Sequence, residues 1–436
     1  MKKVILIIIA TFVLSSNANS QSGWQLVNLN TNKILSKIYM FDNIGYILTD
    51  SILYKTLDKG DSWSIIFTGL PNLDIYTGFF KSPDLGALLK TYPYSPVPGK
   101  LTTNGGKTFD EMNPQLPGIG GIISVFSIYP INHNVIIAAG EEFDFFPVWH
   151  DGVIFKSTNG GQTWTLVYRL PSNPSGIIGL KFKDENSGYA ITSTGLHMTT
   201  NGGGHWAPKA GFAYSFNGKV VCLSDSFNDT IYAAGNTLSA DSYYFRYIRS
   251  IDDGNTWSLI YQSEYTARIR GAFFLNSQTA WVVGDAGLIL HTTNGGADWN
   301  KQISGTTETL YGVSFINSDT GFAVGNNGTL LKTYTGGLVG INQISQNVPT
   351  EIGLSQNFPN PFNPSTVIKF SLPENTHVNL TVYDQLGRIV ESLVDSDLTT
   401  GTYQFIFNAN NLSSGLYYYR LSTVNYNQTK KMVILR

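Results

Sequence analysis

Residues whose side chains could do chemistry gather in an octapeptide that recurs along most of the chain. One clear copy, Ser157-Thr-Asn-Gly-Gly-Gln-Thr-Trp164, sets an Asx residue among hydroxyls and glycines and ends in tryptophan. Oxygen atoms at this spacing could hold a hard cation or a sugar. They could equally close a turn, in which the Asx oxygen accepts a backbone N–H two residues on and glycine adopts a positive φ.

The identity of the Asx residue decides between these two chemistries. A hard cation favours carboxylates, whereas a turn needs only an oxygen acceptor. The third residue of the box is Asp58, Asn104, Asn159, Asn201, Asp252 or Asn294. Because amide and carboxylate replace each other, we predict a structural turn, and neither a metal nor a cofactor. The box tryptophans are expected to pack between sheets, and they are Trp63, Trp164, Trp206, Trp257 and Trp299.

The spacing of the boxes predicts the fold. Successive copies lie 41 to 55 residues apart, counting a degraded seventh copy, "TYTGG", with Thr335 in register. This is the length of one four-stranded propeller blade. Short apolar runs alternate with turns between the boxes and show no helical period, which predicts an all-β chain. Trp24 has no box before it and would complete the seventh blade, giving a seven-bladed β-propeller closed by its N-terminal strand.

Composition and the N-terminus indicate an exported protein. Charged residues make up 13% of the 436 residues and the net charge is -2, which argues against a nucleic-acid partner. Lys2 and Lys3 precede an apolar run that ends in small residues, so we predict a signal peptide over residues 1–20. The mature chain carries a single cysteine and no segment able to span a membrane.

The box pattern resembles the BNR or Asp-box repeat over roughly residues 23–337. Sialidases, sortilin-type receptors, xyloglucan-cleaving glycosidases and photosystem II assembly-factor-like propellers carry this repeat, so the resemblance implies the fold and leaves the function open. If the box joins the third and fourth strands of a blade, the turn between the second and third strands lies on the opposite face.

Three of these opposite turns are long and rich in aromatic residues, in blades two, three and five. Loops that expose rings together favour a recognition surface for a glycan or a protein, although the rings could also pack on one another. An arginine pair opens the inner strand of blade six on the same face. The candidate ligand face comprises Tyr92, Tyr94, Phe145, Phe146, Trp149, Tyr243, Tyr244, Arg268, Arg270 and Tyr311.

A secreted glycoside hydrolase, sialidase-like or xyloglucanase-like, is the alternative function for this face. A sialidase-like site needs three arginines from separate blades, but four of the five propeller arginines lie in blade five and at the start of blade six. A carboxylate-pair glycosidase would draw on Glu141, Glu142, Asp144 and Asp151 in blade three. No catalytic residue is predicted, and non-enzymatic binding or adhesion is the preferred function.

After residue 337 the boxes stop and a second module follows. Residues 338–353 lack periodicity and are expected to form a linker. Residues 354–436 show period-two strands separated by turn clusters, which predicts a small Ig-like β-sandwich. The predicted organisation is therefore a signal peptide (1–20), a propeller (21–337), a linker (338–353) and a sandwich (354–436).

The second module also resembles the type A C-terminal sorting domain of the type IX (Por) secretion system of Bacteroidetes-like bacteria. The motifs are "NFPNPF", "VYD" with "LGR", "SGLY" and a terminal "KKMV". The resemblance implies partners, namely the type IX machinery and its sortase-like protease, and a product secreted or held on the outer surface of a Gram-negative cell. The sorting-signal residues are Pro359, Asn360, Pro361, Asp384, Gly387, Arg388, Gly415, Tyr417, Lys430 and Lys431.

Overall fold

The structure is a computed structural model that describes residues 23–435 with internal gaps. The gaps are residues 69–75, 91–98, 114, 118–121, 146–147, 172–175, 193–194, 213–219, 225–229, 240–241, 264–265, 335, 338–340, 346–347 and 410–411. The signal peptide predicted over residues 1–20 lies outside the described residues. Among the described residues, no helix has the length and apolar character needed to cross a bilayer.

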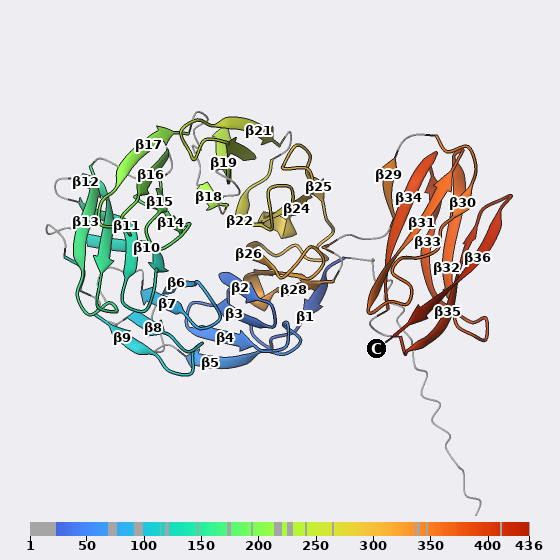
Figure 1. Cartoon of the computed structure of the whole chain (residues 1–436), viewed down its shortest axis with the longest axis horizontal. Coiled ribbons are helices and arrows are strands. Elements are labelled where there is room, and N and C mark those ends of the chain that lie inside the picture. The colour runs from blue at the N-terminus through green and yellow to red at the C-terminus, as the bar shows by residue number, and fades with distance from the viewer. Residues whose placement is uncertain are drawn as a thin grey trace, which may run out of the picture.

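Seven four-stranded antiparallel sheets are arranged in a ring, so the prediction of a seven-bladed β-propeller is confirmed (Figure 1). Blade one is formed by β2 (Lys37–Phe41), β3 (Ile44–Leu48), β4 (Ile52–Thr56) and β5 (Ser64–Thr68), and blade two by β6 (Tyr76–Phe80), β7 (Gly86–Lys90), β8 (Gly99–Thr102) and β9 (Asp110–Met112). Blade three is formed by β10 (Ile122–Pro130), β11 (Ile136–Phe145), β12 (Val148–Ser157) and β13 (Thr165–Leu170). Blade four is formed by β14 (Gly179–Phe182), β15 (Gly188–Ile191), β16 (Gly195–Thr199) and β17 (Ala207–Gly211).

Blades five to seven complete the ring, and short 3-10 turns follow the second strand in the last two. Blade five is formed by β18 (Val220–Leu223), β19 (Ile231–Ser239), β20 (Ser242–Ser250) and β21 (Ser258–Gln262). Blade six is formed by β22 (Ile269–Phe274), β23 (Ala280–Gly284), η1 (Asp285–Gly287), β24 (Ile289–Thr292) and β25 (Asn300–Lys301). Blade seven is formed by β26 (Leu310–Phe315), β27 (Gly321–Gly325), η2 (Asn326–Gly328), β28 (Leu330–Thr333) and β1 (Gln25–Val27).

The N-terminal strand closes the ring, as predicted. β1 pairs with β28 through Gln25 opposite Lys332, Leu26 opposite Leu331 and Val27 opposite Leu330. Trp24, just before β1, is only 2% exposed and donates from Nε1 to Gln302 Oε1 at 3.0 Å. Gln302 in turn donates to Gly336 O at 2.7 Å, so one buried amide joins the two ends of the propeller chain. A ring closed in this way keeps its sheet edges short and protected.

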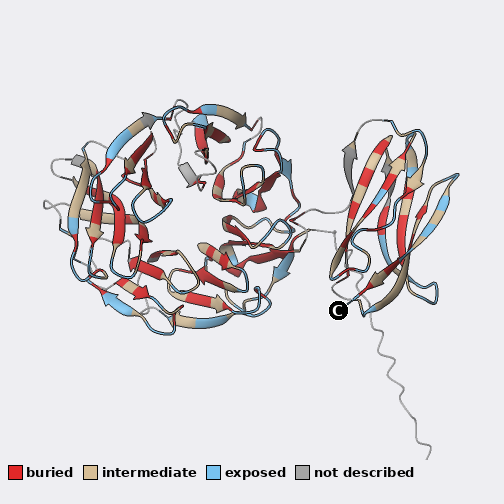
Figure 2. Cartoon of the chain, viewed as in Figure 1, coloured by how far each residue is buried: buried red, intermediate tan, exposed pale blue. Residues whose placement is uncertain are grey.

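The hydrophobic core is divided among the seven interfaces between neighbouring blades. Each pair of adjacent blades shares one cluster of buried residues, including the pair formed by blades seven and one. Buried positions therefore recur on both faces of the blades, while the outer strands are more exposed (Figure 2). Trp164, Trp206, Trp257 and Trp299 are buried and Trp63 is half-buried, within or against these clusters.

The boxes join the third and fourth strands and are held by hydrogen bonds that differ from the predicted ones. The Asx Oδ1 accepts from the backbone N–H four residues on, not two: Thr163 N donates to Asn159 at 2.9 Å. The hydroxyl that opens the box, Ser157 Oγ, donates to the same oxygen and accepts from Gly161 N at 2.8 Å. The same bond from the residue four positions on reaches Asp58, Asn104, Asn201, Asp252 and Asn294.

This arrangement explains why Asp and Asn replace each other. A hydroxyl at the seventh position donates to an Asp, as Ser62 does to Asp58, and accepts from an Asn, as Thr108 does from Asn104. Hydrogen bonds from Ser62 lower the pKa of Asp58 to about 2, so the carboxylate stays charged and accepting at neutral pH. The hydrogen bonds of the Asx side chain are thus internal to the turn.

In blades one and seven, the lysine immediately before the box connects the blade to the next. Lys55 Nζ donates to Gly105 O at 2.7 Å, and Lys332 Nζ donates to Lys59 O at 2.7 Å; both acceptors are box carbonyls of the following blade. In blade six the equivalent residue is His291, which is buried and stacks on Trp281 with ring centroids 4.5 Å apart. Its Nε2 has no hydrogen-bond partner among the described residues, and burial lowers the pKa of His291 to about 4.

The sandwich consists of two four-stranded sheets, with strand orders β29-β34-β31-β30 and β33-β32-β35-β36. Its strands are β29 (Ile341–Ser345), β30 (Gly353–Leu354), β31 (Ser365–Leu372), β32 (Thr376–Tyr383), β33 (Ile389–Leu398), β34 (Gly401–Asn408), β35 (Gly415–Ser422) and β36 (Asn427–Ile434). A single cluster that includes Phe370, Tyr403 and Tyr419 fills the space between the sheets. β29 lies within residues 338–353, so this part of the expected linker is a strand that pairs with β34.

We predict that Trp24→Ala lowers the free energy of unfolding by about 3–5 kcal/mol, because it empties a buried aromatic site and leaves Gln302 without its donor. Leu26→Ala is the matched control, since Leu26 is 71% exposed on the same strand and should change stability by less than about 0.5 kcal/mol. Urea unfolding of the two purified variants measures both values. Equal stability of Trp24→Ala and the unchanged protein would contradict the role of this closure.

We also predict that stability falls as the pH drops from about 7 to 4. The unfolded chain protonates His291 near the ordinary histidine pKa of 6.5, whereas the folded protein does so only near 4, so acid favours unfolding. At about 1.4 kcal/mol per pKa unit, this difference is worth about 3 kcal/mol. His291→Phe keeps a stacking ring and should remove that part of the slope, whereas His205→Gln, on the exposed box of blade four, should leave it intact. Urea unfolding at a series of pH values measures the slopes.

Candidate ligand-binding site

Four predicted residues from three blades meet at the inner ends of blades five to seven, on the face opposite the boxes. The Arg268 guanidinium lies 4.2 Å from the ring centroid of Tyr243, which belongs to blade five. Arg270, two residues on, forms a bidentate pair with Asp285 at 2.7 and 3.1 Å. The hydrogen bond with Asp285 raises the pKa of Arg270, and the charges of Asp285, Tyr311 and Tyr243 add smaller effects in the same direction. We call Tyr243, Arg268, Arg270, Asp285 and Tyr311 the arginine cluster.

Backbone contacts position the arginine cluster. The buried Asn236 of blade five pairs with the backbone of Ile269 in both directions, at 2.8 and 2.9 Å, and so holds the start of β22. Ala267 N donates to Tyr243 O at 2.8 Å. A Cβ on Gly284 would lie 2.1 Å from Arg268 O, so only glycine allows the segment carrying Arg268 to approach the end of β23. The segments that carry Arg268 and Tyr243 are thus held in place through their backbone.

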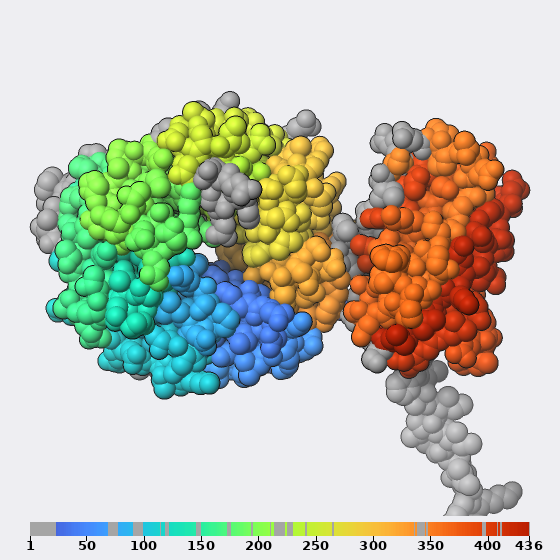
Figure 3. All heavy atoms as spheres, in the orientation of Figure 1, coloured from blue at the N-terminus to red at the C-terminus, as the bar shows by residue number. Residues whose placement is uncertain are grey.

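The two arginines differ in whether a carboxylate neutralises their charge. Arg270 is neutralised by Asp285, whereas Arg268 has a cation–π contact and no ion pair with any carboxylate in the described part of the chain. Both arginines, Tyr243 and Tyr311 are half-buried. A hollow lies at the centre of the ring in the space-filling view (Figure 3). The arginine cluster can therefore accept an anionic or strongly hydrogen-bonding group against an aromatic wall.

Most of the other predicted ligand-face residues cannot be compared with this cluster. Tyr92, Tyr94 and Phe146 lie outside the described residues, and only the backbone is described for Phe145 and Trp149, in β11 and β12. Tyr244 is half-buried on β20 next to Tyr243. The long connections of blades three and five are extended strand pairs, β11–β12 and β19–β20, and the expectation of loops there was wrong. Alternation along β20 buries Phe245 and Tyr247 in the core between blades five and six.

The acidic residues of blade three form an ion cluster that the sequence did not reveal. Arg169 of β13 donates to Asp151 at 2.9 Å and also to Glu142, which is completely buried and lies opposite Asp151 across the β11–β12 pair. Both carboxylates therefore bind the same guanidinium. Arg169 stands 18 residues from Asp151 and 27 from Glu142, and nothing in that spacing signals the contact.

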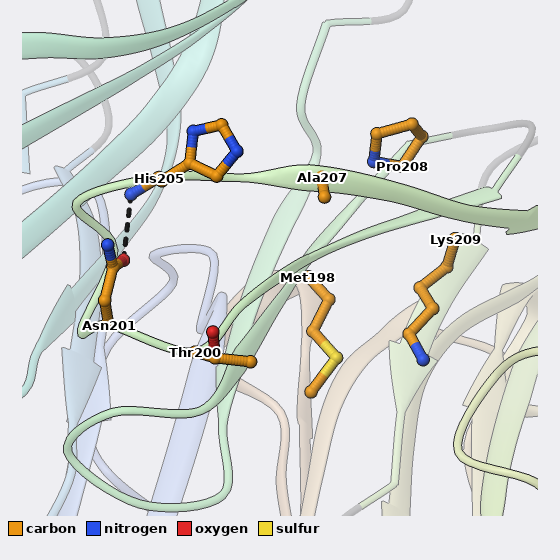
Figure 4. A pocket seen from close by; sticks show the side chains of 7 residues that line it. All are labelled: Met198, Thr200, Asn201, His205, Ala207, Pro208 and Lys209. Atoms are coloured by element: carbon orange, nitrogen blue, oxygen red, sulfur yellow. Dashed lines mark hydrogen bonds between the residues drawn. The ribbon is translucent and has the colours of Figure 1, made fainter.

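The structure also contains hollows, of which the larger is lined in part by Ala286 and Gly287, the residues that follow Asp285. One of about 160 Å³ lies on the box side of blade four, lined by Met198, Thr200, Asn201, His205, Ala207, Pro208 and Lys209 (Figure 4). A wider one of about 720 Å³ follows the segment from Lys301 to Glu308, which connects blades six and seven. Within the described ranges, no group of three or more His, Cys, Asp or Glu side chains is placed to hold a metal.

The sorting-signal residues of the sandwich serve mainly to fix its loops. Asn360 Oδ1, between Pro359 and Pro361, accepts from Val433 N at 2.9 Å, and Asp384 holds the turn at Gly387 by accepting from the backbone and side chain of Arg388. The remaining positions are strand residues: Gly415 opens β35, Tyr417 donates its hydroxyl to Ser413 O, and Lys430 and Lys431 lie on β36.

Comparison with a protein-family description decides the nature of this module. Residues 356–435 match the description "Secretion system C-terminal sorting domain". They form a sorting domain. The domain directs export through the type IX secretion system to the cell surface or the medium, and the secretion machinery is a partner of the chain. A search of curated proteins gave no match.

Solved structures support the propeller fold. "YCF48 bound to D1 peptide" has 18% sequence identity and a TM-score of 0.51, covering 72% of this chain and 97% of that chain. "YCF48 from Cyanidioschyzon merolae" has 18% identity and a TM-score of 0.51, covering 71% of this chain and 98% of that chain. At this identity the similarity shows the fold alone.

We predict that the acidic cluster of blade three contributes to stability. Arg169→Leu leaves Glu142 as a buried charge with a lost partner and should cost about 3–5 kcal/mol. The double variant Glu142→Leu/Arg169→Leu should recover most of that loss, because it removes both charges together. Arg246→Leu, which removes an exposed bond to Gln262, is the control and should change stability by less than about 1 kcal/mol. Unchanged urea unfolding of Arg169→Leu would contradict this role.

Proposed function

We propose that the exported propeller is a non-enzymatic binding or adhesion module, and that its glycan or protein ligand docks on the arginine cluster. The observation that carries this proposal is the placement of Arg268, held on the face of Tyr243 with no carboxylate partner among the described residues. A cation held this way is already oriented, so little conformational entropy is lost when an acidic or polar group binds it.

The fold is compatible with this use. In the related fold of YCF48, a propeller was solved with a D1 peptide bound, which supports a peptide segment as one ligand class for the present chain. Aromatic rings beside a cation suit the apolar faces of sugars and peptide side chains equally. We further propose that the boxes are BNR or Asp-box repeats, that the signal peptide ends at residue 20, and that the mature propeller comprises residues 21–337 in a Bacteroidetes-like cell.

Binding of the purified exported protein to a glycan array and to a peptide array tests the proposal. We expect Arg268→Ala or Tyr243→Ala to weaken ligand binding by at least about tenfold, because each removes one half of the stacked pair. Arg246→Ala is the matched control, since its guanidinium bonds the exposed Gln262 and its loss should leave binding unchanged. Equal binding by Arg268→Ala and the unchanged protein would place the ligand elsewhere.

Product analysis on the same glycans separates this function from a hydrolase. A binding module should return the glycans intact after prolonged incubation. Release of shorter sugars that is lost in Arg268→Ala would instead support a glycoside hydrolase acting on this face.

A further inference from the structure

The sorting domain presents one outer face that differs from the other. Both outer faces of a β-sandwich normally carry polar residues, because only the inner faces are buried. On the sheet β33-β32-β35-β36, strand register instead aligns Ile389, Tyr383, Tyr418 and Lys431 directly opposite one another across all four strands. The next row holds Arg420 between Thr381 and Thr429.

This row is accessible and combines rings with cations. Ile389 is 69% exposed, Lys431 is exposed, and Tyr383 and Tyr418 are half-buried. The Arg420 guanidinium lies 4.8 Å from the ring centroid of Tyr383, which fixes a cation on the row. We call Tyr383, Ile389, Tyr418, Arg420 and Lys431 the aromatic face.

The outer face of the second sheet provides an internal comparison. Its outward residues on β31 and β34 pair as Val367 with Ile406, Lys369 with Gln404, and Ser371 with Thr402. None of these six is aromatic, and only one is charged. The asymmetry therefore belongs to one sheet and does not follow from the fold itself.

The last residues of the edge strand β36 cannot pair with an added strand from a partner. Phe362 N donates to Val433 O and Leu435 N donates to Phe362 O, both at 3.0 Å, and Gln356 donates to Lys431 O at 2.8 Å. The last residues of β36 therefore have their edge groups occupied by the loop that carries Asn360. A partner strand therefore cannot add along these last residues of β36.

We propose that the aromatic face is the surface by which the sorting domain docks on the type IX export machinery, against a protein surface that pairs carboxylates with apolar side chains. The sorting role of residues 356–435 indicates that the partner is the secretion machinery. The side chains of the aromatic face indicate the chemistry of the surface that would bind them. Arg420 and Lys431 would pair with anionic groups of the partner, and Ile389 and the tyrosine rings would be buried against its apolar groups. This inference rests on the export route and is independent of ligand binding by the propeller.

Export of the full-length chain from a type IX-competent host tests the inference. We expect Tyr418→Ser, Arg420→Glu and Lys431→Glu each to lower the exported fraction at least about fivefold and to leave full-length protein in the periplasm. Tyr418→Phe should be exported normally. Lys369→Glu, an exposed charge reversal on the opposite face, is the matched control and should also be exported normally.

Thermal unfolding of each purified variant separates docking from folding. Should Arg420→Glu or Tyr418→Ser lower the melting temperature, Lys431→Glu decides alone, because its side chain lies in solvent. Normal export of Lys431→Glu overturns the proposal, and so does an equal loss of export in Lys369→Glu. Loss of export with unchanged propeller ligand binding supports the aromatic face without bearing on the arginine cluster.

Discussion

The propeller depends on closing a ring from two ends of its chain. Each blade buries one face against the blade before it and one against the blade after it, so an open ring would expose two apolar faces. The seam is small: three residue pairs between β1 and β28, plus Trp24 and the amide of Gln302. Because the hydrophobic cores are shared between blades, this short seam completes the last two of seven interdependent interfaces.

The boxes and the arginine cluster divide the two faces of the ring between them. At one face, the Asx side chain, hydroxyls and glycines satisfy one another within each turn, which leaves little bonding capacity for a ligand. At the other face, glycine at the end of β23 lets the preceding segment come close, and Arg268 emerges beside the ring of Tyr243. The face with the boxes therefore has few free hydrogen-bonding groups for a ligand, whereas the opposite face presents Arg268.

Export and folding place different demands on the C-terminal sandwich. Much of its motif sequence holds loops and one edge together: Asn360 closes the edge of β36, and Asp384 closes the turn before β33. Residues next to these motifs in the sequence point outward because side chains alternate along a strand. Tyr417 and Tyr418 are neighbours, yet the first packs against the core and the second lies on the aromatic face.

The sequence alone determined the all-β class, the seven blades and closure by the N-terminal strand, because each depends on local spacing and period. The sorting domain was identified from the sequence by its resemblance to a known family. The sequence did not determine which distant side chains meet. Asp285 pairs with Arg270, and Arg169 bridges Glu142 and Asp151, only because antiparallel register brings these positions together. The strand-like course of the aromatic insertions and the four-residue reach of the Asx bond were also mispredicted. These features follow from strand pairing and turn closure in three dimensions, which residue types and intervals do not encode.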